Sequence, residues 1–204
     1  MMIGNWATLW PNIVAYVLAG TGLMMLVCRD WRWLLGGLAV VYAGAAALIA
    51  LSWPWTLAAT VLVGGWMAAS VLGLSQWHVP PETTAERPSA RMFRLLAGLL
   101  VLPLVLSLTP MMQAWLPVDR TRLGASLALM ALGMWQLGLR GQRPLWVVGA
   151  LLTVLAGFDI LYAALEQSLL LAGLLALVIV ALALVGGYLV VQEQEALNEE
   201  EASL

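Results

Sequence analysis

The sequence predicts an all-α, polytopic transmembrane helical bundle of about seven spans, with the N-terminus outside and the C-terminus cytoplasmic. Hydrophobic residues make up 63% of the 204 residues and charged residues only 10%, far from the balance of a soluble globular domain. Long apolar runs alternate with short polar stretches, and a spanning helix needs about 20 apolar residues. We therefore expect an integral protein of a bacterial plasma membrane, with the lipid bilayer as a partner.

The apolar runs define the expected spans in chain order. They cover roughly residues 10–27, 33–51, 55–75, 92–110, 123–139, 145–163 and 167–191. The fifth run, LGASLALMALGMWQLGL, is near the lower length limit for crossing, so a re-entrant path is open for it. The short SWPWT connection predicts a tight hairpin between the second and third spans. We expect one transmembrane domain at 1–191, with a polar linker at 75–91, and an acidic cytoplasmic tail at 192–204.

The arginines predict the orientation, because positively charged loops stay in the cytoplasm. One side collects the connections after spans one, three and five, which hold Arg29, Arg32, Arg87, Arg91, Arg94, Arg140 and Arg143. The other side holds only Arg120 and Arg122, beside Asp119.

Tryptophan supports the same span boundaries, because an indole prefers the headgroup level of a bilayer. Nine of the 11 tryptophans lie near predicted span ends: Trp6, Trp10, Trp31, Trp33, Trp53, Trp55, Trp77, Trp115 and Trp146. Trp66 lies in mid-span, where we expect it to pack against lipid or a partner helix. A cofactor-stacking or substrate role is the alternative to this interfacial belt.

Composition also excludes several classes of function. The net charge is -2 and the chain has no Lys, so no basic face invites nucleic acid. The lone Cys28 excludes an internal disulfide or a bound iron-sulfur cluster, and with the lone His78 it cannot form a multidentate metal cluster. No nucleophile and base pair or phosphate loop occurs, so we expect no cofactor, no metal and no catalysis by this chain on its own.

One acid lies inside the apolar sixth span, within AGFDILYAALEQS: Asp159, which we expect toward the outer leaflet. An ionised carboxylate facing lipid costs a few kcal/mol, so Asp159 must face protein or water, or carry a proton. Two roles stay open: a hydrogen bond to Tyr162, Thr153 or a neighbouring backbone, and a part in proton transfer. Glu166 is the second candidate for a polar intramembrane contact, on Asp159's face if the helix is unbroken. We expect instead a turn near ALEQS that places Glu166 at the positive start of span seven.

Small residues and prolines predict how the spans pack. We expect close helix contacts where glycine is abundant in spans two, three and seven, at Gly36, Gly37, Gly44, Gly64, Gly65, Gly186 and Gly187. Pro103 is expected to kink span four and leave one carbonyl without its helical donor. The acidic EQEALNEEE segment is expected to extend span seven as a polar helix, either solvated or docked on a basic partner.

The stretch LGASLALMALGMWQLGLRGQRPLWVVGALLTVLAGFDILYAALEQSLLLAGLLALVIVALALVGGYLVV resembles the last three spans of hydrogenase-4 component E. That membrane subunit of formate hydrogenlyase-type complexes is akin to the small K-type subunit of complex I and the C-type subunit of multisubunit antiporters. The CRDWRW loop, the polar linker and the RGQRP loop are similar as well. The resemblance implies a helical subunit between large antiporter-like subunits. Such subunits usually carry a Glu in the cytoplasmic or middle part of span six, where VGALLTVLAG has none, so Asp159 is not equated with it.

Three hypotheses for function follow. The first is a non-catalytic membrane subunit of a complex I-like, membrane-hydrogenase-like or antiporter-like assembly that supports proton or cation translocation, with other many-span subunits as partners. The second is an orphan membrane scaffold or assembly protein. The third is a small self-sufficient transporter, which the scarcity of intramembrane polar residues and the lack of a clear inverted repeat disfavour.

Overall fold

The computed structural model describes residues 3–77, 88–140, 143–166 and 168–202. Within these ranges the chain is all-α, with seven helices and no strand. The helices are α1 (Ile3–Val27), α2 (Trp31–Ile49), α3 (Trp55–Ser75), α4 (Pro88–Gln113), α5 (Arg120–Arg140), α6 (Pro144–Leu165) and α7 (Leu169–Ala202). In this part of the chain six helices, all except α5, are long and apolar enough to cross a membrane. The expectation of an integral membrane helical protein is confirmed at this level.

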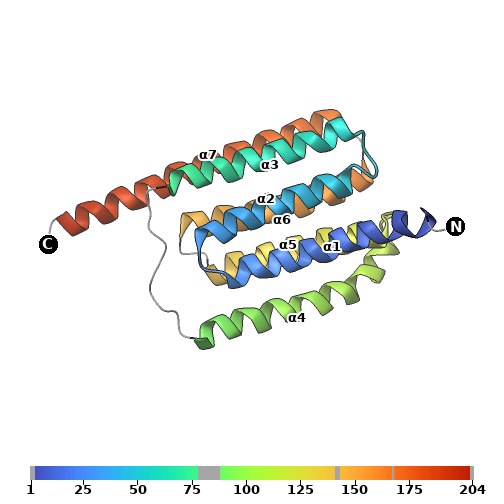
Figure 1. Ribbon diagram of the computed structural model, residues 1–204, viewed down its shortest axis with the longest axis horizontal. Helices are drawn as coiled ribbons and strands as arrows, with labels where there is room; N and C mark the ends of the chain where they lie inside the picture. The colour runs from blue at the N-terminus through green and yellow to red at the C-terminus, as the bar shows by residue number, and fades with distance from the viewer. Residues whose placement is uncertain (1–2, 78–87, 141–142, 167, 203–204) are drawn as a thin grey trace.

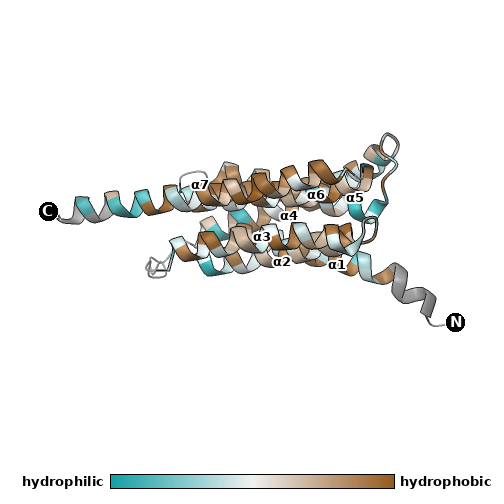
Figure 2. Ribbon diagram, turned by 90° about the horizontal axis from the view of Figure 1, so that it is seen from above, coloured by the Kyte–Doolittle hydropathy of each residue, from teal (hydrophilic) through white to brown (hydrophobic). Residues whose placement is uncertain are grey.

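The helices form two layers (Figures 1 and 2). One layer is α1, α2 and α3, and the other is α5, α6 and α7. Each helix of the first layer packs on its counterpart in the second, so that α1 contacts α5, α2 contacts α6 and α3 contacts α7. Helix α4 lies at one edge, against α1 and α5. The bundle is therefore two helices thick, and its outer helices leave much apolar surface uncovered by this chain.

The connections between the helices lie alternately at the two ends of the bundle. The α1–α2 and α5–α6 connections lie at the same end as the C-terminus, and the α2–α3, α4–α5 and α6–α7 connections lie at the N-terminal end (Figure 1). Helix α7 continues past the bundle through a hydrophilic segment (Figure 2). It runs without a break to Ala202, as expected for a polar continuation of the last span.

Helix α6 occupies the middle of the structure, between α5, α2 and α7, and it has the largest buried share of the six candidate spans. Its Leu152 and Ala156 belong to the main core together with Leu38 and Tyr42 of α2. A second, smaller core joins α4 to α5. The main core therefore depends on how closely α6 approaches its neighbours.

Glycine allows the closest of these approaches, between α5 and α6. A Cβ atom on Gly133 would lie 2.9 Å from the Ala150 carbonyl oxygen, and one on Gly157 would lie 2.8 Å from the Ser126 carbonyl oxygen. Real Cβ atoms do not approach backbone this closely, so only glycine fits both sites.

The glycines expected from the sequence to allow close packing mostly do so. Side chains of neighbouring helices cover five of them within contact distance, at Gly37, Gly44, Gly65, Gly186 and Gly187, and Gly64 lies against Ala176. Gly36 differs, because nothing lies within 4 Å of a Cβ built there.

The tryptophan belt is only partly as expected. Trp33, Trp55, Trp77 and Trp115 are exposed near helix ends, but Trp53 and Trp146 are buried in the main core. These two indoles therefore lie near helix ends, as expected, but they pack against neighbouring helices and are not exposed on the surface. Trp66 lies in mid-helix, half exposed, as expected for a side chain against lipid or a partner, and its indole donates to the Ala39 carbonyl oxygen at 3.2 Å. The Trp6 side chain and His78 lie outside what the structure describes.

We predict that Gly133→Val lowers the stability of the detergent-solubilised protein by about 1–3 kcal/mol, because the added methyl groups overpack the α5–α6 contact. Gly138→Val is the matched control on the same helix, since nothing lies within 4 Å of a Cβ at Gly138. The two changes alter helix propensity equally, so thermal unfolding of the variants isolates the packing effect. Equal destabilisation would contradict the close-contact account.

Candidate functional site

Asp159 lies on α6, roughly 22 Å along the helix axis from Pro144 at 1.5 Å per residue. Its side chain is only 3% exposed and faces the protein. The position agrees with the expectation that this acid avoids lipid.

The neighbouring hydroxyl groups do not hold Asp159. The Tyr42 hydroxyl donates to the Leu152 carbonyl oxygen at 3.0 Å, and the Thr153 hydroxyl donates to the Gly149 carbonyl oxygen at 2.8 Å. Among the described residues, neither Oδ2 of Asp159 nor the buried hydroxyl of Tyr162 has a hydrogen-bond partner. The hydrogen bond expected from Thr153 or Tyr162 is therefore not formed, because helix backbone takes up the Thr153 donor.

An aromatic cluster adjoins the acid. Tyr162 is three residues after Asp159 and so lies on the same side of α6. Its ring contacts Trp53 edge-on, with centroids 6.2 Å apart, and stacks on Phe158 at 6.4 Å. The indole nitrogen of Trp53 is also buried without a hydrogen-bond partner in the described residues.

We call Asp159, Tyr162 and Trp53 the α6 polar cluster. It brings one acceptor, one donor and one hydroxyl that both donates and accepts into a buried region at the N-terminal end of the bundle. Buried polar atoms in native proteins usually have a partner, which is often an ordered water. The cluster therefore has the chemistry to hold water or to accept and release a proton.

Glu166 is not part of this cluster. The predicted turn near ALEQS is present: α6 ends at Leu165, and the Glu166 amide donates to the Tyr162 carbonyl oxygen at 2.9 Å. Glu166 has extended backbone and an exposed side chain. The first turn of α7 holds no acid, so the expectation that Glu166 begins span seven is wrong. The break in the helix also removes it from the buried face of Asp159.

The described parts of the chain contain no candidate metal site. No group of three or more His, Cys, Asp or Glu side chains is placed there to hold an ion.

Arg140 has a role that the sequence did not reveal. It lies buried at the end of α5, with its guanidinium donating to the Cys28 carbonyl oxygen at 2.6 Å and stacked over the Trp146 ring at 4.0 Å. The last carbonyls of a helix lack intrahelical partners, so Arg140 caps the end of α1 and ties it to α5 and α6. From the sequence this arginine counts only toward the charge of a loop, because the cap becomes evident only when α1 and α5 are known to be neighbours.

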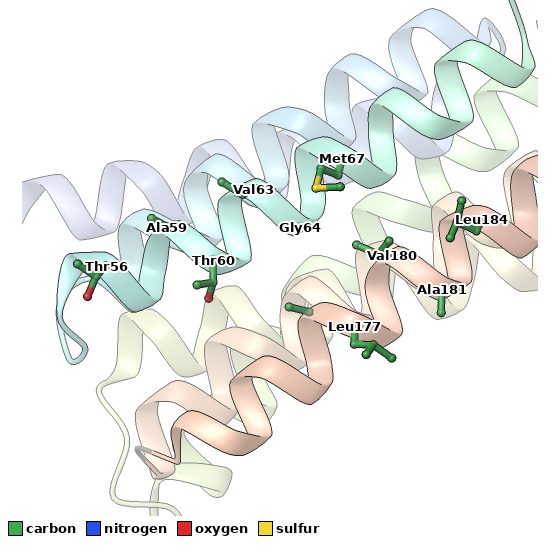
Figure 3. Close-up of a pocket in the computed structure, with 11 residues that line it drawn as sticks. Thr56, Ala59, Thr60, Val63, Gly64, Met67, Leu177, Val180, Ala181 and Leu184 are labelled. Carbon is green, nitrogen blue, oxygen red and sulfur yellow. The ribbon is translucent and has the colours of Figure 1, made fainter.

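A groove lies between α3 and α7 on the surface of the described structure (Figure 3). It has a volume of about 650 Å³ and an almost wholly apolar lining. Thr56 and Thr60 lie toward one end, and Met67 and Leu184 toward the other. Small residues, including Ala59, Gly64 and Ala181, form much of its floor and walls.

Comparison of the chain with protein-family models, with curated proteins and with solved structures found no match.

Proposed function

We propose that this chain is a non-catalytic integral membrane subunit of a complex I-like, membrane-hydrogenase-like or multisubunit antiporter-like assembly, and that it supports proton or cation translocation. The observation that best supports a role as a subunit is the α3–α7 groove, which is apolar and has small residues in its lining. Small residues let helix backbones approach closely in a bilayer, so a helix of another many-span subunit fits this groove. The kind of assembly rests on the resemblance of residues 123–191 to hydrogenase-4 component E.

The two-layer shape supports the same proposal. A bundle two helices thick buries little of its outer helices, and α1, α4 and α7 have the smallest buried shares among the candidate spans. Large apolar faces suit a protein that packs between bigger membrane partners.

We further propose that α5 is a seventh span. It has 21 residues, which is about 31 Å at 1.5 Å per residue and matches a hydrocarbon core of about 30 Å. Its low hydropathy comes partly from Gln136 and Arg140, which are buried against protein. Because α1, α4 and α6 surround it, α5 needs less apolar surface than a lipid-facing helix.

A second candidate function, a membrane scaffold or assembly protein, is favoured by the helical extension of α7. Glu193, Glu195 and Glu199 lie on this continuous helix beyond the apolar core. It offers an acidic, preformed surface to a basic partner at the cytoplasmic side of the proposed topology.

The partner proposal is tested by mild-detergent purification of the tagged chain from its native membrane, followed by mass spectrometry. We expect many-span subunits of antiporter or hydrogenase type to co-purify, and Ala181→Leu to reduce their recovery by filling the groove. Gly20→Leu is the control, since a Cβ at Gly20 meets nothing within 4 Å. A chain recovered alone under mild conditions would contradict the subunit role, and equal losses for both variants would contradict the groove.

The topology is tested by cysteine labelling in a Cys28→Ser background. With seven spans, Trp115→Cys in the α4–α5 connection should react with an impermeant maleimide on intact cells, and Glu195→Cys only in inverted vesicles. Three crossings separate these exposed sites. Labelling of both from one side would mean that α5 does not cross, and the opposite pattern would reverse the orientation.

The role proposed for Asp159 as a protonatable contact is tested by Asp159→Asn. We expect stability to change by no more than about 1 kcal/mol, because the amide is nearly isosteric and removes a buried ionisable group. Proton translocation by the intact assembly, measured by fluorescence quenching in inverted vesicles, should fall. Glu166→Gln, at the exposed turn, should leave both measurements unchanged. Unaltered translocation in Asp159→Asn would assign the acid a structural role.

A further inference from the structure

A second cavity lies between α1, α4 and α5 at the N-terminal end of the bundle, away from the α3–α7 groove. It is partly enclosed and has a volume of about 310 Å³, at the lower end of the roughly 300–1,000 Å³ of ligand pockets. Unlike the groove, it has a charged residue in its lining, Arg120.

Polarity changes with depth along this cavity. Asn12, Arg120 and Thr121 lie nearest the end of the bundle, and Leu102, Val105 and Ala128 line the inner part. Ala128 is eight residues after Arg120 on α5, about 12 Å deeper at 1.5 Å per residue. The lining is therefore polar at the headgroup level and apolar toward the membrane interior.

A hydrogen bond between α1 and α5 holds the polar residues at the mouth of the cavity in place. The Thr121 hydroxyl donates to Oδ1 of Asn12 at 2.7 Å, which fixes α1 to α5 beside the cavity. Arg120 is exposed at this mouth. The next arginine, Arg122, turns instead to the hydroxyl of Ser52 in the α2–α3 connection. Arg120, and not Arg122, therefore supplies the guanidinium group in the lining of the cavity.

The apolar inner part is closed by the smaller core. Val101 and Val105 of α4 pack with Ala128 and Leu132 of α5 to form that core. Leu106, next to Val105 in the lining, is well exposed on the outer surface of α4. The cavity therefore adjoins the lipid-facing side of α4, from which an acyl chain can enter.

We propose that this cavity binds an anionic phospholipid, with the phosphate on Arg120 and the first part of an acyl chain against Leu102, Val105 and Ala128. A guanidinium matches a phosphate with two parallel hydrogen bonds, and an apolar interior favours an apolar ligand. A free anion can bind only to Arg120 at the polar mouth, whereas a phospholipid can bind Arg120 and also fill the apolar inner part of the cavity. This lipid would fill the wedge between the edge helix α4 and the rest of the bundle.

The test is thermal unfolding of the detergent-solubilised full chain during titration with dioleoylphosphatidylglycerol, dioleoylphosphatidylcholine or inorganic phosphate. We expect phosphatidylglycerol alone to raise the melting temperature in a saturable way. Arg120→Gln should weaken its apparent affinity roughly tenfold, the effect of losing a charge-assisted hydrogen bond. Arg91→Gln, an exposed arginine at the other end of the bundle, should bind as the unaltered chain does.

A second variant tests the apolar half while leaving Arg120 in place. Gly124 lines the cavity, and a Cβ there meets only the Thr109 hydroxyl at 3.9 Å, so Gly124→Leu should fold and fill the space. We expect it to lose the phosphatidylglycerol effect. Equal stabilisation by phosphatidylcholine, reproduction of the effect by inorganic phosphate, or full binding by both variants would each overturn the proposal.

Discussion

The close approach of α5 and α6 at Gly133 and Gly157 is the constraint on which the rest of the structure depends. Lipid tails are as apolar as leucine, so helices in a bilayer gain little from hiding apolar surface from one another and associate through packing. Two glycines that admit backbone contact supply such packing. With α5 fixed against it, α6 is left in the middle of the slab, where α2 and α7 complete its cover. Burial of Asp159 follows from that position.

The same constraint divides the helices into a tight centre and looser edges. The main core extends from the central helices into α1, α3 and α7, and the α6 polar cluster lies at its N-terminal end. At the edges, α4 packs mainly on α1 and α5, and α3 and α7 form a groove along their junction. Cavities open where packing is incomplete, so both surface sites proposed for other molecules lie beside edge helices.

The sequence predicted the helices well because length and apolarity along the chain decide them. The break after Leu165 and the short α2–α3 hairpin were recognisable from local sequence, as were several close-packed glycines such as Gly65 and Gly186. Gly133 and Gly157, which form the closest backbone contacts, were not among the glycines expected to pack closely.

The burial of Trp53 was not recognisable from local sequence, nor was the capping of α1 by Arg140. The burial of Trp53 and the cap by Arg140 both depend on which helices become neighbours. A tryptophan's position near the end of a span does not specify which face of the helix its indole lies on. Local sequence also left open whether Thr153 donates to Asp159, and in the structure the Thr153 hydroxyl donates to an acceptor in its own helix.

Arg140 and the α6 polar cluster are buried at opposite ends of the bundle, and they differ in how their hydrogen bonds are satisfied. Arg140 is held by carbonyl oxygens of α1 and by the Trp146 ring, which is how a group that serves only to join helices should be satisfied. In the described structure the α6 polar cluster is the reverse case: the Trp53 indole contacts the Tyr162 ring, Asp159 lies three residues before Tyr162 on α6, and the Trp53 indole nitrogen, the Tyr162 hydroxyl and Oδ2 of Asp159 have no hydrogen-bond partner in the protein. Leaving such atoms unpaired costs free energy that better-matched residues would avoid. The contrast between the partnered guanidinium of Arg140 and the unpartnered atoms of the α6 polar cluster therefore favours the cluster as the candidate site for handling a proton or water.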